Sequence, residues 1–286
     1  MSKNRDTSAR GRAKLFTSVP AHAALPALAV LALILGPLLA LLTRIPWRQL
    51  PQLLNDPGVL EATCLSTLTA LGATVICALL GTPTSLVLST VLERTRALPL
   101  TWVLYGLIYA PIIFSPVVSG LALLFLWGRR GLVGSWLETA GLSVGYTPLA
   151  VLLAQIFVAL PFFIATTVTT LRALPVEYEE IARLEGASPA EVTSRVLLPL
   201  AAPGLLTAAV LSFARALGEY GATVTFAGNV AGSTRTIPLA IELALSSNDM
   251  TQALGGALML IALYLMILAA LGCALWLRRL KGRLRP

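Results

Sequence analysis

Charged residues are scarce in this chain: they make up 12% of its 286 residues, and aromatic residues make up only 7%. Soluble domains carry about 25% charged residues, so the composition excludes an ordinary soluble domain. The rest of the composition agrees, because 57% of the residues are hydrophobic and the mean hydropathy is +0.83. An integral membrane protein is therefore predicted.

Lysine is almost absent, with Lys3, Lys14 and Lys281 as the only three. A phosphate-binding loop of the form GxxxxGK[ST] needs a lysine beside its glycines, and none of the three lies in such a context. The chain therefore cannot be an ATPase, and any ATP-driven activity needs a partner that hydrolyses ATP.

Metal-binding and catalytic residue types are also rare. There is one histidine, and Cys64, Cys77 and Cys273 lie inside apolar runs without the spacing of metal ligands. Such cysteines behave as small hydrophobic residues, so no metal site is expected. An intramembrane protease or lipid transferase would need a Ser/His/Asp cluster or paired acids at membrane depth, whereas only Arg215 and Glu219 lie there. No catalytic residue is predicted.

Long uncharged runs are what the sequence has instead. Five reach or exceed the roughly 20 residues needed to cross a bilayer: Ala23–Thr43, Ala62–Leu92, Ala97–Gly128, Thr139–Leu171 and Met250–Leu277. A sixth run begins at Pro199 and carries two charges. A barrel is disfavoured because its strands would alternate polar and apolar residues. We expect an all-α membrane protein whose transmembrane domain, residues 23–277, holds six spans near residues 24–43, 63–88, 100–127, 147–171, 200–227 and 252–277.

Lysine and arginine are distributed unevenly between the segments that separate the spans. With the amino terminus inside, the inside segments hold 15 of them and the outside segments hold 5. This bias places the basic tails 1–22 and 278–286, and the charged segment 172–199, in the cytoplasm. The net charge of +8 is then a signal of topology in the cell membrane rather than a surface for nucleic acid.

The charged segment predicts two short helices joined at a glycine. Pro175 suits the first position of a helix, and three glutamates then fill its first turns, which favours the positive end of the helix dipole. Gly186 indicates a helix stop. Ser188 and Glu191 have the spacing of a capping box, so a second helix is expected to start there and to run to the next apolar segment.

The same segment carries a family resemblance. EIARLEG at 180–186, followed after nine residues by VLLP at 196–199, resembles the EAA loop of binding-protein-dependent ABC importer permeases. Ile181, Glu185 and Val196 depart mildly from that pattern. The resemblance implies a type I ABC importer fold, in which this segment is a coupling loop that docks into a groove of a cytoplasmic ATPase. The residues it assigns to ATPase coupling are Glu180, Ala182, Gly186, Ala187 and Pro199.

Two further stretches narrow the resemblance. WGRRGLVGSWLE at 127–138 and SFARALGEYGATVTFAGNVAGSTRTIPLAIE at 212–242 are similar to molybdate permeases, which resemble the sulfate and tungstate permeases. They imply import of an oxyanion by alternating access, with molybdate as the first choice. Sulfate, tungstate or thiosulfate stays open as the substrate.

The resemblance also implies partners. They are a cytoplasmic ABC ATPase dimer that uses ATP and Mg²⁺, an extracytoplasmic molybdate-binding protein, and a second copy of this chain, which would give a homodimer with its two-fold axis along the pore. The chain itself is then a transport permease and not an enzyme, and it binds no cofactor of its own.

Arg215 and Glu219 are the ionisable residues inside the fifth span. Such residues are costly in hydrocarbon and mark functional positions, and a spacing of four lets them pair on one helix face. In one interpretation Arg215 gives a passing oxyanion a transient positive partner, from which Glu219 then displaces it. Gly221 and Thr223 would then line the same pathway or gate. In the other interpretation the pair is structural and pins a bend between Gly218 and Gly221.

The loop after the fifth span carries Asn229, Ser233 and Arg235. Backbone N–H groups, hydroxyls and a cation are the groups that bind tetrahedral oxyanions, so this outer loop is a candidate oxyanion contact. A plain receptor-facing loop is an equally open interpretation.

The third span is interrupted by APIIFSP, in which Pro111 and Pro116 each remove a helical hydrogen bond. Interrupted helices are tolerated at membrane depth where the freed backbone faces protein or a cavity. The interruption predicts either a packing kink or a flexible wall of a gate.

Overall fold

The computed structural model describes residues 24–94 and 99–283. The chain divides into two compact units, residues 1–47 and 48–286. The described part of the first unit holds α1 (Ala24–Thr43), a helix of 20 residues with exposed apolar side chains. Such a surface suits a span that faces lipid. The predicted basic tail 1–22 lies outside the described residues.

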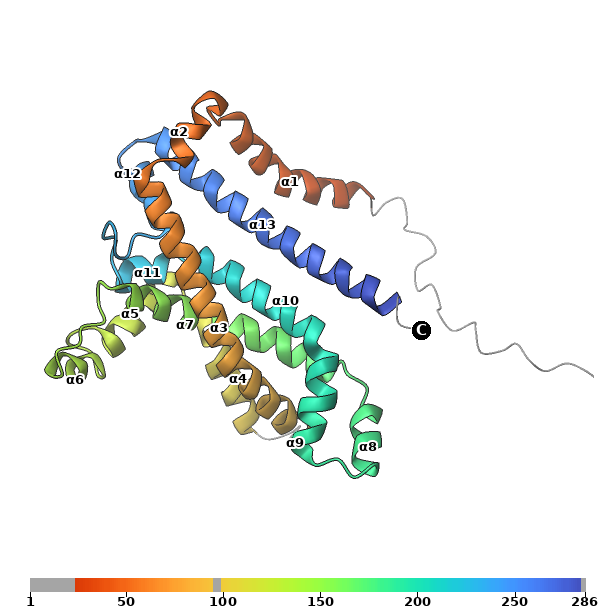
Figure 1. The fold of residues 1–286 in the computed structure, drawn as a ribbon. Helices are drawn as coiled ribbons and strands as arrows, with labels where there is room; N and C mark the ends of the chain where they lie inside the picture. Colours follow the sequence, from red (N-terminus) through yellow and green to blue (C-terminus); the bar gives the residue numbers. More distant parts are fainter. Residues whose placement is uncertain (1–23, 95–98, 284–286) are drawn as a thin grey trace, which may run out of the picture. The chain divides into compact units, whose positions relative to one another are not determined.

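The second unit is helical, and a short 3-10 helix, η2 (Trp47–Gln49), lies at its start. Its helices are α2 (Leu50–Leu54), α3 (Pro57–Arg94), α4 (Pro99–Ile113), α5 (Pro116–Trp127), α6 (Gly134–Thr139), α7 (Pro148–Arg172), α8 (Glu177–Leu184), α9 (Pro189–Glu191), the π-helix η3 (Val192–Leu197), α10 (Leu198–Leu217), α11 (Gly221–Phe226), α12 (Ile237–Ser246) and α13 (Met250–Arg283) (Figure 1). The predicted all-α fold class is confirmed. Among the described residues, five helices are long and apolar enough to cross a bilayer, and α4 with α5 makes a sixth if the pair counts as one span.

Helices α3, α7 and α10 pack side by side as the core of the second unit (Figure 1). Their contact surface is built from fully buried small residues, among them Ala70, Ala73, Ala159, Ala208 and Ala216. Small side chains let helix backbones approach closely, which drives helix association where lipid removes the hydrophobic force. The approach is closest at Gly204 of α10, where an added Cβ would overlap the side chain of Thr170 on α7. Close packing therefore ties the middle of α10 to α7.

The predicted third span is sharply broken. α4 and α5 are bent by 112° relative to each other. Ser115 caps α5, since its Oγ accepts a hydrogen bond from the N–H of Val118 at 3.3 Å. Pro116 takes the first helical position, where its missing N–H costs nothing. The expected span 100–127 is thus two helices rather than one, and the interruption expected at APIIFSP is present.

The predicted fifth span, residues 200–227, is divided as well. α10 ends at Leu217, and a new short helix, α11, begins at Gly221. The hydroxyl of Tyr264 on α13 donates a hydrogen bond of 3.2 Å to the carbonyl of Ala214, which also accepts from the N–H of Gly218 at 3.2 Å. The carbonyl of Ala214 thus accepts two hydrogen bonds in the last turn of α10. The expected fifth span is therefore two helices, and the bend that one interpretation placed between Gly218 and Gly221 is present. The three residues between α10 and α11 are called the span-five break below.

Candidate functional site

The first helix of the charged segment, α8, ends in a glycine motif. Gly186 has φ of +85°, and its N–H donates to the carbonyl of Arg183 at 3.0 Å. The N–H of Ala187 donates to the carbonyl of Ala182 at 3.0 Å. This pair of bonds is a Schellman motif, which needs a residue in the left-handed region. The predicted stop at Gly186 is confirmed, although α8 starts two residues later than the proline suggested.

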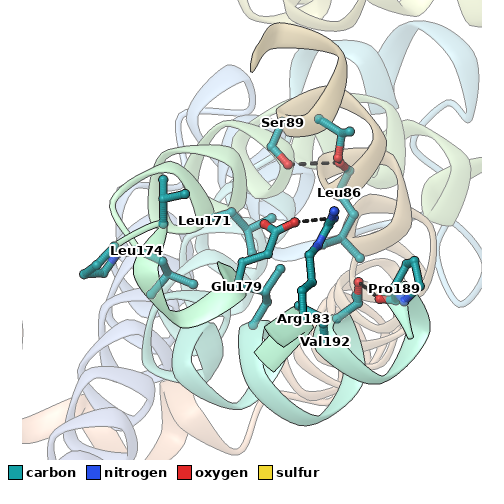
Figure 2. A pocket seen from close by; sticks show the side chains of 13 residues that line it. Leu86, Ser89, Leu171, Leu174, Glu179, Arg183, Pro189 and Val192 are labelled. Carbon is teal, nitrogen blue, oxygen red and sulfur yellow. Dashed lines mark hydrogen bonds and ion pairs between the residues drawn. The ribbon is translucent and has the colours of Figure 1, made fainter. Parts of the chain in front are cut away.

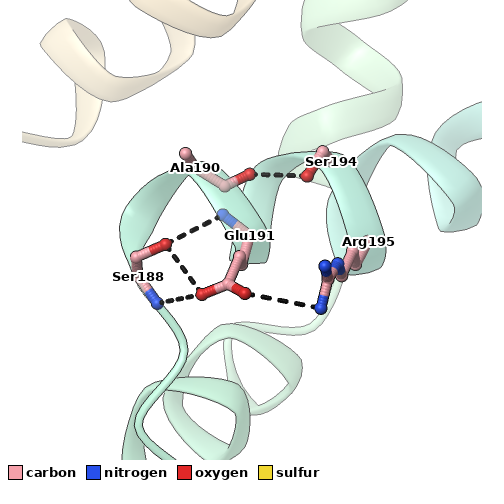
Figure 3. A network of polar contacts seen from close by, with 5 residues as sticks. All are labelled: Ser188, Ala190, Glu191, Ser194 and Arg195. Carbon is pink, nitrogen blue, oxygen red and sulfur yellow. Dashed lines mark hydrogen bonds and ion pairs between the residues drawn. The ribbon is translucent and has the colours of Figure 1, made fainter.

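The second helix opens with the predicted capping box. The Ser188 Oγ accepts from the N–H of Glu191 at 3.4 Å, and one carboxylate oxygen of Glu191 accepts from the N–H of Ser188 at 3.1 Å and from its hydroxyl at 2.9 Å (Figure 3). The other carboxylate oxygen lies 3.4 Å from a guanidinium nitrogen of Arg195. The Ser188 backbone N–H, and then its hydroxyl, hold the pKa of the Glu191 carboxyl below its usual range.

The second helix does not end where the apolar segment begins. α9, the π-helix η3 and α10 follow one another as a single helix of 29 residues from Pro189 to Leu217. Pro199 has no N–H, so the carbonyl of Arg195 loses its usual helical donor. The N–H of Leu198 reaches back five residues to Thr193, which is the π hydrogen bond. The charged segment is therefore continuous with the fifth span through a π turn.

The inward face of α8 is polar and closes a cavity of about 320 Å³. Glu179 and Arg183 pair at 2.5 Å on this face (Figure 2). The remaining wall comes from the ends of α3 and α7 and from η3, through Leu86, Ser89, Leu171, Leu174, Val192 and Thr193, among others. The ion pair thus lies on the side of α8 that faces the bundle.

Away from the cavity, α8 exposes three apolar side chains. Tyr178, Ile181 and Leu184 are all exposed, and Leu184 most of all at 87%. Residues three apart lie on neighbouring positions of one helix face, so the three form one stripe, which we call the α8 stripe. The α8 stripe is therefore a candidate surface for contact with another protein.

Across the span-five break lies an ion pair. A guanidinium nitrogen of Arg215 is 2.6 Å from one carboxylate oxygen of Glu219, and the side chains are 30% and 2% exposed. The other carboxylate oxygen accepts from the N–H of Ala222 at 2.7 Å. Glu219 therefore joins the last turn of α10 to the first turn of α11, which agrees with the interpretation of a pinned bend.

The start of α11 packs tightly against α5. An added Cβ at Gly221 would overlap the Cβ of Pro116, and one at Gly120 would meet the Cβ of Thr225 at 2.5 Å. Both glycines are buried. The breaks of the third and fifth spans therefore meet at a contact that only glycine allows.

In the loop after α11, most of the hydrogen-bonding groups already bond to the loop itself or to neighbouring segments. The Nε of Arg235 donates to Oδ1 of Asn229 at 2.9 Å, the Nδ2 of Asn229 donates to the carbonyl of Leu239 at 3.1 Å, and the hydroxyl of Ser233 donates to the carbonyl of Tyr146 at 3.1 Å. The backbone N–H groups of residues 233–235 all donate to one carbonyl, that of Val230. The loop is therefore well ordered by its own hydrogen bonds, but these donors do not point outward to bind an oxyanion.

The sequence of the chain matches a known family of membrane proteins. A family model described as the binding-protein-dependent transport system inner membrane component matches residues 68–285. The chain belongs to this family. It is thus a permease subunit of an ABC importer and a multi-pass inner-membrane protein.

Two relatives show how the permease compares in sequence. It is 44% identical over 227 residues to the molybdenum transport system permease protein ModB of Mycobacterium tuberculosis, which covers 79% of this chain and 84% of that protein. It is 32% identical over 239 residues to the sulfate transport system permease protein CysT of Escherichia coli, which covers 84% of each. Both alignments take in most of the membrane domain.

The permease also resembles a solved structure. The crystal structure of a bacterial ABC transporter involved in the import of the acidic polysaccharide alginate matches 93% of this chain and 96% of its own, with a TM-score of 0.62 and 16% identity. At that identity the match concerns the fold alone, and it agrees with the type I importer fold expected from the sequence.

The residues assigned from the sequence fall into two groups. Of the coupling residues, Glu180, Gly186 and Pro199 are exposed, whereas Ala182 and Ala187 are half-buried. Of the pathway residues, Gly221 and Thr223 are fully enclosed by protein, so in this arrangement they line no path.

The α8 stripe was missed by sequence reasoning, although its spacing of three was visible in the sequence. The family motif marks Ala182 instead, one position further along the same helix.

Proposed function

We propose that this permease forms the membrane pathway of an ATP-driven importer that carries molybdate into the cytoplasm by alternating access. The observation that carries the proposal is the 44% identity to a molybdenum permease over 79% of the chain. Sulfate is the second candidate, because the sulfate permease aligns over 84% of both chains at 32% identity. Tungstate belongs with molybdate as a tetrahedral dianion of similar chemistry.

The proposal assigns each side of the permease a partner. Both termini and the charged segment 172–199 face the cytoplasm, where a separate ATPase dimer binds ATP and Mg²⁺. One coupling segment per chain, set against a pair of ATPase subunits, requires two copies of the permease, and a two-fold homodimer is the simplest arrangement. An extracytoplasmic molybdate-binding protein docks on the opposite side, where the loop of residues 228–236 lies. The permease itself binds no cofactor.

Coupling runs through α8 and the helix that follows it. The α8 stripe enters the groove of the ATPase, and Glu180 lies beside it. The Schellman motif at Gly186 and the capping box at Ser188 fix the angle between α8 and the second helix. Because the second helix continues into α10, a movement of the ATPase surface reaches the span-five break.

The break supplies the chemistry for an oxyanion. Arg215 is 30% exposed and its guanidinium can turn from Glu219 to a passing dianion. Glu219 keeps the hydrogen bond from the N–H of Ala222 while the pair is open, and it takes the guanidinium back when the anion leaves. The carboxylate thereby limits how long the anion is held, which a pathway needs.

Uptake by proteoliposomes tests the proposal. Vesicles that contain the permease, its ATPase and its binding protein are loaded with ATP and given labelled molybdate, with excess sulfate or tungstate as competitor. ATP-dependent uptake that tungstate reduces and sulfate does not is the expected result. Vesicles with a catalytically inactive ATPase are the control. Uptake of labelled sulfate that excess molybdate leaves undisturbed would overturn the choice of molybdate.

A further inference from the structure

Gln155, in the middle of α7, is fully buried, and neither its Nε2 nor its Oε1 has a hydrogen-bond partner among the described residues. A glutamine amide can make up to four hydrogen bonds, and burying it without any is unfavourable. Full enclosure also means that Gln155 touches no substrate in this arrangement. Such a side chain needs an explanation.

The neighbours of Gln155 place it beside the span-five break. One turn along α7, Ala159 belongs to a core cluster with Ala216 and Leu217, the last residues of α10. One turn in the other direction, Val151 belongs to a second cluster with Ala222, at the start of α11. Gln155 lies between the two clusters, at the level where α10 gives way to α11.

Unpaired polar groups are concentrated at this level. Thr223 on α11 is also fully buried and its hydroxyl has no partner among the described residues. Three of the five buried side-chain polar atoms without a partner in the described part of the chain therefore belong to Gln155 and Thr223, on two neighbouring helices.

The backbone of the break offers groups that such side chains could bond. The N–H of Glu219 donates to the carbonyl of Ala216 at 3.1 Å, so it is withdrawn from the carbonyl of Arg215, its partner in an unbroken helix. A shift of the break by one residue exchanges these partners. The hydrogen bonds at the break are thus the ones that a movement of α10 against α11 would change.

We propose that Gln155 is a positioning residue for the span-five break: its amide is unpaired in this arrangement and hydrogen-bonds the backbone of residues 218–220 in the ATP-bound one. The proposal rests on the alternating access proposed above. An unpaired amide raises the free energy of one state only, so it shifts the population towards the other. The permease would then leave the arrangement described here more readily when the ATPase binds ATP.

Gln155→Met tests this, because methionine keeps the length and removes the hydrogen-bonding groups. Thr167→Val is the matched control. Thr167 lies three turns further along α7, is fully buried and has an equally unpaired hydroxyl among the described residues, but it lies away from the break. Both substitutions remove an unsatisfied polar group, so both should raise the melting temperature of the nucleotide-free transporter.

Only Gln155→Met should alter the transition. In the complete transporter, the fraction in the ATP-bound arrangement, read from spin-label distances between the two permease copies with non-hydrolysable ATP, should fall about tenfold relative to the other state, as the loss of one or two hydrogen bonds in that state predicts. Thr167→Val should leave it unchanged. Wild-type populations for Gln155→Met, or a lower melting temperature in the resting state, would overturn the proposal. The distances need no cargo, so a wrong substrate assignment would not affect them.

Discussion

Arg215 and Glu219 face each other across the span-five break, and their contacts explain how two ionisable residues persist inside an apolar span. The carboxylate is almost fully enclosed and uses both oxygens, one for the guanidinium and one for the N–H of Ala222. A buried charge is tolerated when each of its acceptor atoms has a partner. The pair is therefore a structural clamp first, and any contact with an anion must open it.

The first prediction concerns this clamp. Arg215→Gln leaves the enclosed carboxylate with one backbone partner, and since Arg215 is 30% exposed we expect a loss of about 2–3 kcal/mol in unfolding free energy, below the usual range for a fully buried pair. The double variant Arg215→Gln/Glu219→Gln should recover most of it, because the new amide oxygen can still accept from Ala222. Thermal unfolding in detergent compares the two. A double variant as unstable as the single one would contradict the clamp.

The second prediction concerns pH and the capping box. The pKa of the Glu191 carboxyl is lowered by the Ser188 N–H and hydroxyl. A lowered pKa means that its contribution is fully present above the ordinary glutamate value of about 4.3 and is lost as the pH falls through the lowered value. Hydrogen exchange at the Ser188 amide, corrected for the intrinsic rate, should lose protection only in that acid range. Glu191→Gln should show no such step, and a step near neutral pH would refute the assignment.

At the scale of helices, the sequence predicted what depends on near neighbours in the chain. The stop at Gly186 and the capping box of Ser188 and Glu191 involve residues at most five apart, so their signals are local. A contact at the end of α10 joins residues far apart instead, because the hydroxyl of Tyr264 donates to the carbonyl of Ala214, 50 residues away. No local pattern could reveal that contact.

The helix breaks of the third and fifth spans also depend on contacts between residues that are far apart in the sequence. Gly221 could be noticed in the sequence, but its reason, a contact with Pro116, joins segments more than a hundred residues apart. The π turn lies between these cases, because Pro199 was visible but a proline alone does not decide between a kink, a stop and a π turn.

The third prediction tests the π turn. Pro199→Ala restores an N–H to the helix, so residues 192–197 can return to α geometry, and the charged segment should rotate relative to α10 by about 100°. The free energy of unfolding should stay the same, while the number of substrate ions carried per ATP falls at least several-fold. Pro203→Ala, in the same helix, removes a proline without touching the π turn and should leave the ratio unchanged. Equal effects of the two would argue against a role for the turn.

For the whole molecule, the proposed function makes the α8 stripe the surface that meets the ATPase. Tyr178, Ile181 and Leu184 are exposed in the permease alone, and their burial in a groove would stabilise the complex by removing apolar surface from water. The ion pair of Glu179 and Arg183 lies on the side of α8 that lines the cavity. We therefore expect the affinity for the ATPase to depend on the apolar residues of the α8 stripe more than on Glu179 and Arg183.

The fourth prediction follows. Leu184→Ser should weaken binding of the ATPase in detergent about 10- to 100-fold, since a buried leucine contributes about 1.5–3 kcal/mol, and it should leave the melting temperature of the permease unchanged. Leu132→Ser is the matched control, because Leu132 is 79% exposed but lies in the loop before α6. Titration of labelled ATPase measures both. If Leu184→Ser leaves the affinity for the ATPase unchanged, α8 is not part of the interface.

The unbroken helix from Pro189 to Leu217 has a mechanical consequence. Its 29 residues rise about 43 Å, and Gly204, held against Thr170, lies at its midpoint. This helix contains a π turn and Pro203, so it acts as a bent lever held near its middle: when one end moves inward, the other moves outward. Closing the ATPase dimer would draw the coupling ends of two such levers together and spread their far ends at Arg215. A pore that opens on one side as it closes on the other then needs no separate structural element to couple its two gates.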